Sequence, residues 1–152
     1  IGLEGLAAPN ITQMASEIGT SRATVMNYIK DLEEARLVNL VYHEGDEFPK
    51  KPAQIMMHNT NLMYSIYPVK VEEQDVLDTF FMNTLYKDHK LYKGDTVNKG
   101  RRIGMYIVDG VEIHVCDKNK HVKTQANSYC ARYNTEVGHN NDIPLWLFGF
   151  LY

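Results

Sequence analysis

Cysteine, tryptophan and basic charge are all scarce in this sequence of 152 residues. Its two cysteines, Cys116 and Cys130, lack the CxxC spacing of metal and redox motifs, and no disulfide framework is evident. This usage favours a reducing, cytoplasmic location. No stretch approaches the roughly 20 apolar residues that span a bilayer, so we expect no membrane association. No basic and apolar leader opens the chain, so nothing indicates secretion.

Basic residues do not outweigh acidic ones, and the formal net charge is -3. Affinity for a phosphate backbone grows with the number of phosphates that are neutralised, so any contact with nucleic acid must be local. The sequence also lacks a glycine-rich phosphate loop ending in Lys-Ser or Lys-Thr, so this piece is not itself a P-loop ATPase. With 44% apolar and 23% charged residues, it has the composition of one globular domain or two small ones.

The segment 11–36 predicts two helices joined by a tight turn, a helix-turn-helix. Gly19 permits the sharp reversal, and Thr20 or Ser21 can cap the second helix. The expected buried residues of the first helix are Ile11, Met14, Ala15 and Ile18. Those of the second helix are Val25, Tyr28, Ile29 and Leu32. Residues 1–10 suit a further helix that supports this pair.

The outward positions of the second helix carry side chains that contact phosphates and base edges in a major groove. These residues are Ser21, Arg22, Thr24, Asn27 and Lys30. We therefore predict that this helix contacts double-stranded DNA. The alternatives are a helix pair that only packs or one that contacts protein. Met26, which we expect to be exposed on the second helix, and the acidic net charge favour protein contact. A DNA complex must also tolerate the acidic residues Asp31, Glu33 and Glu34.

A hairpin follows directly, with strands expected at residues 37–42 and 54–58 and a polar turn between them. A hairpin in this position is a wing, and Lys50 and Lys51 near its tip would reach the DNA backbone. The alternative is a solvated basic pair balanced by nearby acids. Asn59 and Thr60 can cap a short helix that Pro68 closes. We assign residues 1–68 to a winged helix-turn-helix domain.

Residues 69–152 predict a small α/β sheet domain, which makes the whole chain α+β. An amphipathic helix is expected at residues 71–87, where Val76, Phe80 and Leu85 would face inward. Strands are expected at 91–92, 103–108 and 111–116, and Asp109-Gly110 indicates a hairpin between the last two. A second helix is expected at 122–133, and a strand buried on both faces at 143–152. The aromatic residues of that last segment are expected in the core: Trp146, Phe148, Phe150 and Tyr152.

The order of these segments is similar to the C-terminal part of a largely uncharacterised family of bacterial AAA-type ATPases. The segments that carry the resemblance are SRATVMNYIKDLEEARLVNLVY, MMHNTNLMYSIY, DTFFMNTL, the DKNK turn and IPLWLFGFLY. The resemblance covers almost the whole chain and implies a P-loop domain upstream, then a winged helix, then a restriction-endonuclease-like domain. It also implies that ATP and Mg²⁺ belong to the upstream ATPase domain, which would be a partner, and that this fragment itself has no cofactor. Oligomerisation is compatible with this arrangement.

Metal-dependent nucleases of that fold hold Mg²⁺ with an Asp and a Glu on a hairpin, and a Lys orients the attacking water. Aligning this sequence on the DKNK turn places Met105 at the Asp position and His114 at the Glu position. Lys118 keeps the Lys, and Asp78 occupies the position of an assisting acid on the preceding helix. Because thioether and imidazole are poor ligands for hard Mg²⁺, we interpret these as vestigial positions, with no catalytic residue and no metal.

The leading hypothesis is a non-catalytic, DNA-binding C-terminal module of an AAA-type ATPase. One alternative is a protein-interaction or regulatory module for the ATPase part, and another is a working metal-dependent nuclease. A basic patch beside the vestigial hairpin would extend a nucleic-acid surface, provided that its members converge in space. These members are Lys99, Arg101, Arg102, Lys118, Lys120 and Lys123.

Overall fold

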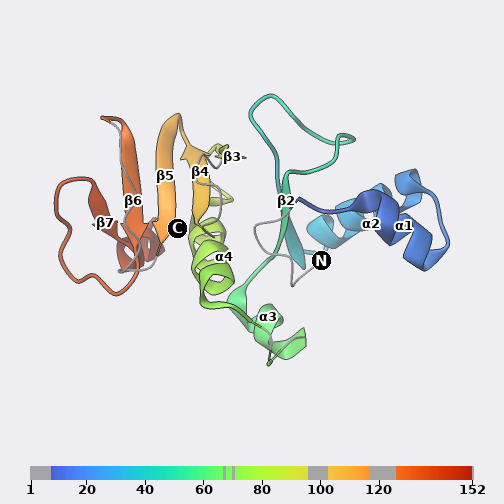
Figure 1. The fold of residues 1–152 in the computed structure, drawn as a ribbon, viewed down its shortest axis with the longest axis horizontal. Helices are drawn as coiled ribbons and strands as arrows, with labels where there is room; N and C mark the ends of the chain where they lie inside the picture. Colours follow the sequence, from blue (N-terminus) through green and yellow to red (C-terminus); the bar gives the residue numbers. More distant parts are fainter. Residues whose placement is uncertain (1–7, 67, 70, 96–102, 117–125, 152) are drawn as a thin grey trace.

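The computed structural model describes residues 8–66, 68–69, 71–95, 103–116 and 126–151, and it is α+β (Figure 1). A helix pair leads into a two-stranded hairpin, and two further helices lead into a five-stranded mixed sheet. The elements of the first part are α1 (Ile11–Ile18), α2 (Arg22–Glu34), β1 (Val38–Val41), β2 (Gln54–Met57) and α3 (Thr60–Ile66). Those of the second part are α4 (Glu73–Leu85), β3 (Leu91–Lys93), β4 (Gly104–Val108), β5 (Val111–Cys116), β6 (Ser128–Arg132), β7 (Asp142–Pro144) and the 3₁₀ helix η1 (Leu145–Phe150).

The predicted helix pair is confirmed, together with the residues that limit it. Asn10 Oδ1 accepts a hydrogen bond of 3.1 Å from Gln13 N at the start of α1. Gly19 ends α1 with a left-handed φ of 72°, a conformation that glycine adopts without steric cost. Ser21 then caps α2, where its Oγ accepts from Thr24 N at 3.1 Å. The tight turn thus follows from the two residues Gly19 and Ser21.

The predicted buried stripe of α2 is confirmed at Val25, Ile29 and the partly buried Leu32, but it is wrong at one position. Met26, which we expected outside, is 9% exposed, whereas Tyr28, expected inside, is 53% exposed. Ile18 of α1 is also exposed rather than buried. Val25, Met26 and Ile29 form the inner face of α2, because α2 packs against both α1 and the hairpin. The hairpin is the second packing partner of α2, and it covers Met26 while Tyr28 stays in solvent.

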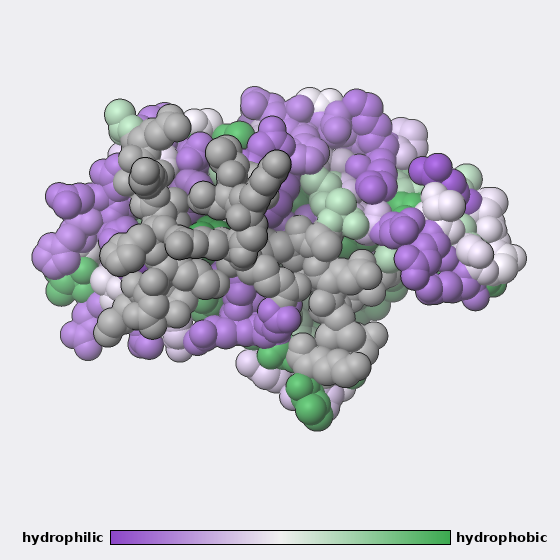
Figure 2. All heavy atoms as spheres, in the orientation of Figure 1, coloured by the Kyte–Doolittle hydropathy of each residue, from purple (hydrophilic) through white to green (hydrophobic). Residues whose placement is uncertain are grey.

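The hairpin β1–β2 lies between two hydrophobic cores, and every residue of its two strands is buried (Figure 1). Because side chains alternate along a strand, one face of the hairpin packs on the helix pair and the other on α4 and the large sheet. Leu40 and Ile55 belong to the first core, while Val41 and Met56 belong to the second. Only the connecting loop is left to act as a wing, and its surface is mainly hydrophilic (Figure 2). The division into two domains at residue 68 stays a prediction.

The large sheet has the order β3-β4-β5-β6-β7, and α4 packs on one of its faces. The pairs β3–β4 and β4–β5 are antiparallel, whereas β5–β6 and β6–β7 are parallel. Asp109 and Gly110 both have positive φ in the turn between β4 and β5, which confirms the predicted hairpin. Phe81 of α4 stacks on Tyr106 of β4, with ring centroids 5.7 Å apart. This face of the sheet therefore holds the second core.

Two sequence predictions in the second half are wrong. Residues 128–132 form strand β6, where we expected the end of a helix; residues 117–125 lie outside the described part of the chain. The segment 143–152, expected as one strand, leaves the sheet at Pro144 and continues as η1. Proline lacks the N–H that a longer strand would need. Within η1, Phe148 is buried as expected, but Trp146 and Phe150 are exposed; Tyr152 is outside the described residues.

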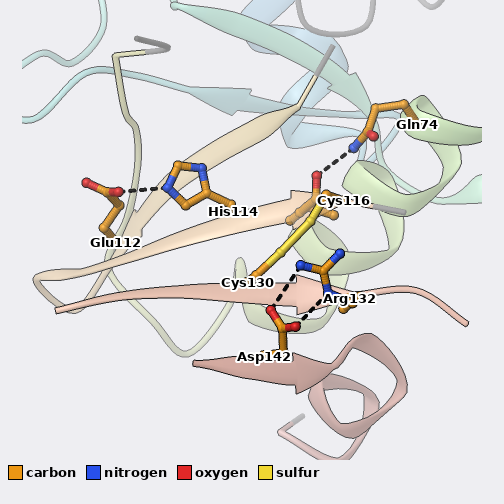
Figure 3. The surroundings of a disulfide bond; sticks show 8 residues. Gln74, Glu112, His114, Cys116, Cys130, Arg132 and Asp142 are labelled. Carbon is orange, nitrogen blue, oxygen red and sulfur yellow. Dashed lines mark hydrogen bonds and ion pairs between the residues drawn. A yellow bond between two sulfur atoms is a disulfide. The ribbon is translucent and has the colours of Figure 1, made fainter. Parts of the chain in front are cut away.

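The two cysteines form a disulfide between β5 and β6, although no disulfide framework was evident from the sequence (Figure 3). His114 lies opposite Cys130 in the parallel register, which places Cys116 diagonally across from Cys130, with Cα atoms 6.8 Å apart. Both cysteines are fully buried. The cytoplasmic location stays a prediction. None of the helices in the described residues is long and apolar enough to cross a membrane.

Candidate nucleic-acid interface and nuclease-like hairpin

The first two turns of α2 present Arg22 and Asn27 to solvent. Neither side chain has a hydrogen-bond or ion-pair partner within the part of the chain that the structure describes. Ser21 and Thr24, two other predicted contact residues, bond to each other through their hydroxyls at 2.9 Å and complete the helix cap. Of these four residues, Arg22 and Asn27 therefore remain available to a ligand, while Ser21 and Thr24 position the helix.

Lys30, also predicted to contact DNA, is held in a chain of interactions between the two halves of the molecule. Its Nζ lies 2.6 Å from Glu33 Oε2, and this hydrogen bond raises the pKa of Lys30. The other oxygen of Glu33 accepts a hydrogen bond of 2.5 Å from the hydroxyl of Tyr86, just after α4. Burial, and then Glu33, raise the pKa of Tyr86. In the free protein, Glu33 thus largely neutralises the charge of Lys30.

In the loop between β1 and β2, which we predicted to be a wing, one of the two predicted lysines is paired and the other is not. Lys50 Nζ pairs with Asp46 Oδ1 at 2.5 Å, whereas Lys51 is exposed and has no partner among the described residues. The base of the loop is fixed to β3, because Lys93 N donates to Tyr42 O at 2.7 Å and His43 Nδ1 lies 3.1 Å from Lys93 O. Lys51 is therefore the wing's available cation.

The three described positions that we aligned with nuclease residues, Met105, His114 and Asp78, do not converge on one site. Met105 and His114 are partners across β4 and β5, so their side chains lie on the same face of the sheet. Asp78 lies on the opposite face, with α4, next to Gly104. Lys118, like the predicted basic patch at 99–102 and 118–123, lies outside the described residues. His114 instead bonds to Glu112 through Nε2, at 2.7 Å (Figure 3).

A buried polar cluster, which the sequence reading missed, surrounds Asp78 on the α4 face. Gln74 Nε2 donates to the carbonyl of Val115 at 2.8 Å and lies 3.4 Å from Asp78 Oδ2. Lys93 Nζ lies 4.6 Å from the centre of the Tyr106 ring, and its side chain is also buried. The signal that was available is the pair of polar residues Gln74 and Asp78, which are four apart and therefore share a face of the helix.

The electrostatics of this cluster are dominated by burial. Loss of solvent raises the pKa of the Asp78 carboxyl to about 7, opposed by the positive charge of Lys93 and the hydrogen bond from Gln74. Burial alone raises the pKa of Asp75, one turn earlier. Burial also lowers the pKa of Lys93, against the pull of Asp78. A carboxyl that changes charge near neutral pH is therefore enclosed where α4 meets β2 and β4.

The space beside this cluster is too small for a substrate. The cavity that Asp75 and Asp78 line together with Gln54 and Met63 has a volume of about 10 Å³, which is room for about one water molecule. Among the described residues, no three His, Cys, Asp or Glu side chains are grouped to hold a metal ion. The cluster thus joins α4 to the hairpin and the sheet.

Comparisons with protein-family models, with curated proteins and with solved structures found no match to this chain. The resemblance to AAA-type ATPases therefore stays a prediction. The functional argument depends on the residues described above.

Proposed function

We propose that this chain is a non-catalytic module that binds double-stranded DNA through the N-terminal half of α2. The observation that supports this is the exposure of Arg22 and Asn27, without partners in the described chain, directly after a well-capped helix-turn-helix. Recognition helices contact base edges with their N-terminal residues. Arginine pairs with guanine and asparagine with adenine in the major groove, and arginine also contacts phosphates.

The charge distribution limits this interface to a small footprint. Lys30 and Lys50 are already ion-paired, and the C-terminal half of α2 exposes Asp31 and Glu34. Contacts to DNA are therefore expected from the first turns of α2 and from Lys51. Each neutralised phosphate adds about 0.9 to the slope of log affinity against log salt, so a small footprint gives a shallow slope.

The test is fluorescence anisotropy of a labelled duplex at two salt concentrations. We expect Arg22→Ala and Asn27→Ala each to weaken binding by about tenfold, within the range for one base contact. The matched control is Arg36→Gln, which removes an equally exposed charge just beyond the other end of α2 and should leave affinity unchanged. Absence of binding, or equal losses in Arg22→Ala and Arg36→Gln, refutes the proposal.

A second candidate function, a protein-interaction or regulatory module, is supported by an apolar groove along α1 and α2. This groove has a volume of about 490 Å³, and Ile18 and Tyr28 on its walls are 63% and 53% exposed. A protein partner would remove this apolar surface from water. The partner that we propose is an upstream AAA-type ATPase domain, which would also supply the ATP and Mg²⁺ chemistry. Tyr28→Gln, which adds no charge to α2, should weaken binding to that domain and leave the DNA affinity unchanged. Arg22→Ala should weaken DNA binding and leave binding to that domain unchanged.

A further inference from the structure

A second pocket of about 490 Å³ lies between α4, η1 and the segment that follows β6. This volume is typical of sites for small molecules. Three aromatic residues from three different segments line it: Phe80, Tyr133 and Trp146. Leu77 and Leu145 add apolar surface, and Glu136 contributes a carboxylate. The pocket is distant in sequence from the proposed DNA surface and independent of it.

Contacts with the core and the sheet position two of the three aromatic walls of this pocket. Phe80 precedes Phe81, which is fully buried and contacts Phe148 of η1 edge-on at 5.0 Å. The backbone N–H of Tyr133 donates to Cys116 O at 3.0 Å, which ties Tyr133 to the sheet. Trp146 contacts the Phe150 ring, with centroids 6.0 Å apart, and both rings are exposed. Two walls are therefore in place before any ligand arrives, which lowers the entropic cost of binding.

The charge of the pocket lining is acidic once its ion pair is taken into account. Arg132 lines the pocket, but its guanidinium makes two contacts of 3.0 Å to the Asp142 carboxylate (Figure 3). The hydrogen bond from Nη2 and the close approach of Nε form an ion pair that offsets the charge of the arginine. Glu136 is exposed and has no ion-pair partner among the described residues. An anionic ligand would therefore meet a carboxylate without a compensating cation.

We propose that this pocket binds an organic cation, namely an alkylammonium or quaternary ammonium group on an apolar stem. Aromatic faces attract such cations through their quadrupoles, and Glu136 adds an opposite charge. The apolar leucines suit the stem. This assignment rests on the combination of three aromatic walls, an ion-paired arginine and an unpaired carboxylate in one pocket.

Trp146 makes the test direct, because it is the only tryptophan of the chain and is 51% exposed at the pocket. Its fluorescence is followed while choline is added at constant ionic strength, and again with 3,3-dimethylbutanol, the neutral molecule of the same shape. We expect a saturable change for choline at about tenfold lower concentration than for the alcohol, since a desolvated cation–π contact is worth about this factor. Equal concentrations for the two ligands, or no saturation with choline, would overturn the proposal.

Two variants assign the binding to named residues. Phe80→Leu keeps an apolar side chain and removes an aromatic face, and Glu136→Gln removes the charge; each should weaken choline binding about fivefold. The control Tyr28→Leu removes an exposed aromatic ring from the other groove and should have no effect. Circular dichroism checks that Phe80→Leu is folded. If Phe80→Leu is not folded, the test depends on the exposed residue Glu136. Unchanged choline affinity in Glu136→Gln would then contradict the proposal.

Discussion

The carboxylate of Asp78 lies directly against the backbone of Gly104, so that the helix α4 and the strand β4 touch where residue 104 has no side chain. A Cβ added to Gly104 would overlap Asp78 Oδ1 and would lie 2.8 Å from the carboxyl carbon. The buried cluster around Asp78 therefore requires glycine at this position. Larger residues would force α4 off the sheet, because packed interiors have little free space.

Gly104→Ala should lower the free energy of unfolding by about 2 kcal/mol, the usual cost of overpacking a core. Urea denaturation measures this change. Combining Gly104→Ala with Asp78→Ala removes the carboxylate that the new methyl group meets, so the two losses should sum to more than the loss in the double variant. Strictly additive losses would show that the two residues do not clash.

The folding stability should fall as pH rises from about 4 to about 7, because the Asp78 carboxyl has a folded-state pKa of about 7 and an ordinary pKa near 4 when unfolded. The protonated form is favoured in the folded protein, so its stabilising effect is complete below the unfolded pKa and lost above the folded one. The slope contributed by this single group is at most about 1.4 kcal/mol per pH unit. Asp75, whose pKa burial also raises, acts in the same direction.

Urea denaturation of the wild type and of Asp78→Asn at pH 4.5, 6 and 8 tests this dependence. The wild type should lose stability relative to Asp78→Asn at each step, since the amide cannot ionise. A constant difference between the two proteins across this range would contradict a raised pKa.

Tyr86→Phe should destabilise the protein by about 1.5 kcal/mol, because it removes the hydroxyl that donates to the carboxylate of Glu33. Thermal or urea unfolding measures this loss. Tyr64→Phe is the matched control, since Tyr64 is 50% exposed on α3 and should tolerate the change. Equal stability of both variants would mean that the Tyr86–Glu33 bond between the two halves contributes nothing.

Reduction of the disulfide should cost about 3 kcal/mol, the value expected for a loop of about 15 residues. Cys116→Ala combined with Cys130→Ala should lose a similar amount and become insensitive to reductant. Thiol titration of the unfolded protein gives a direct check. Two reactive thiols in protein prepared without reductant would show that the buried cysteines are not bonded.

Truncation should destabilise the protein more at Met26 than at Tyr28, which is the opposite of what the helical spacing predicts. Met26→Ala is expected to cost about 2–3 kcal/mol because it opens a cavity in the core of the helix pair. Tyr28→Ala, at an exposed position, should cost less than about 0.5 kcal/mol. A larger loss at Tyr28 than at Met26 would disagree with the position of α2 described here.

The sequence by itself determined several local elements of this protein, mainly in its first half. The extent of α1, the Gly19 turn, a cap at Thr20 or Ser21 and the Asp109-Gly110 hairpin were all predicted, because each depends on residues that are close together in the sequence. The structure selects Ser21 as the cap. The available side chains Arg22 and Asn27 were also in the predicted set, since they follow from the start of a capped helix. The DNA contact assigned to them stays a prediction.

Only the tertiary structure decided which faces are covered and which distant residues meet. The hairpin is buried on both sides, Met26 rather than Tyr28 faces inward, and Cys116 meets Cys130, because partners far away in the chain pack there. The same applies to the polar cluster of Asp78 and to the pocket beside Trp146, whose walls come from separate segments. Spacing along a chain reports which residues share a face, but it carries no information about what that face will contact.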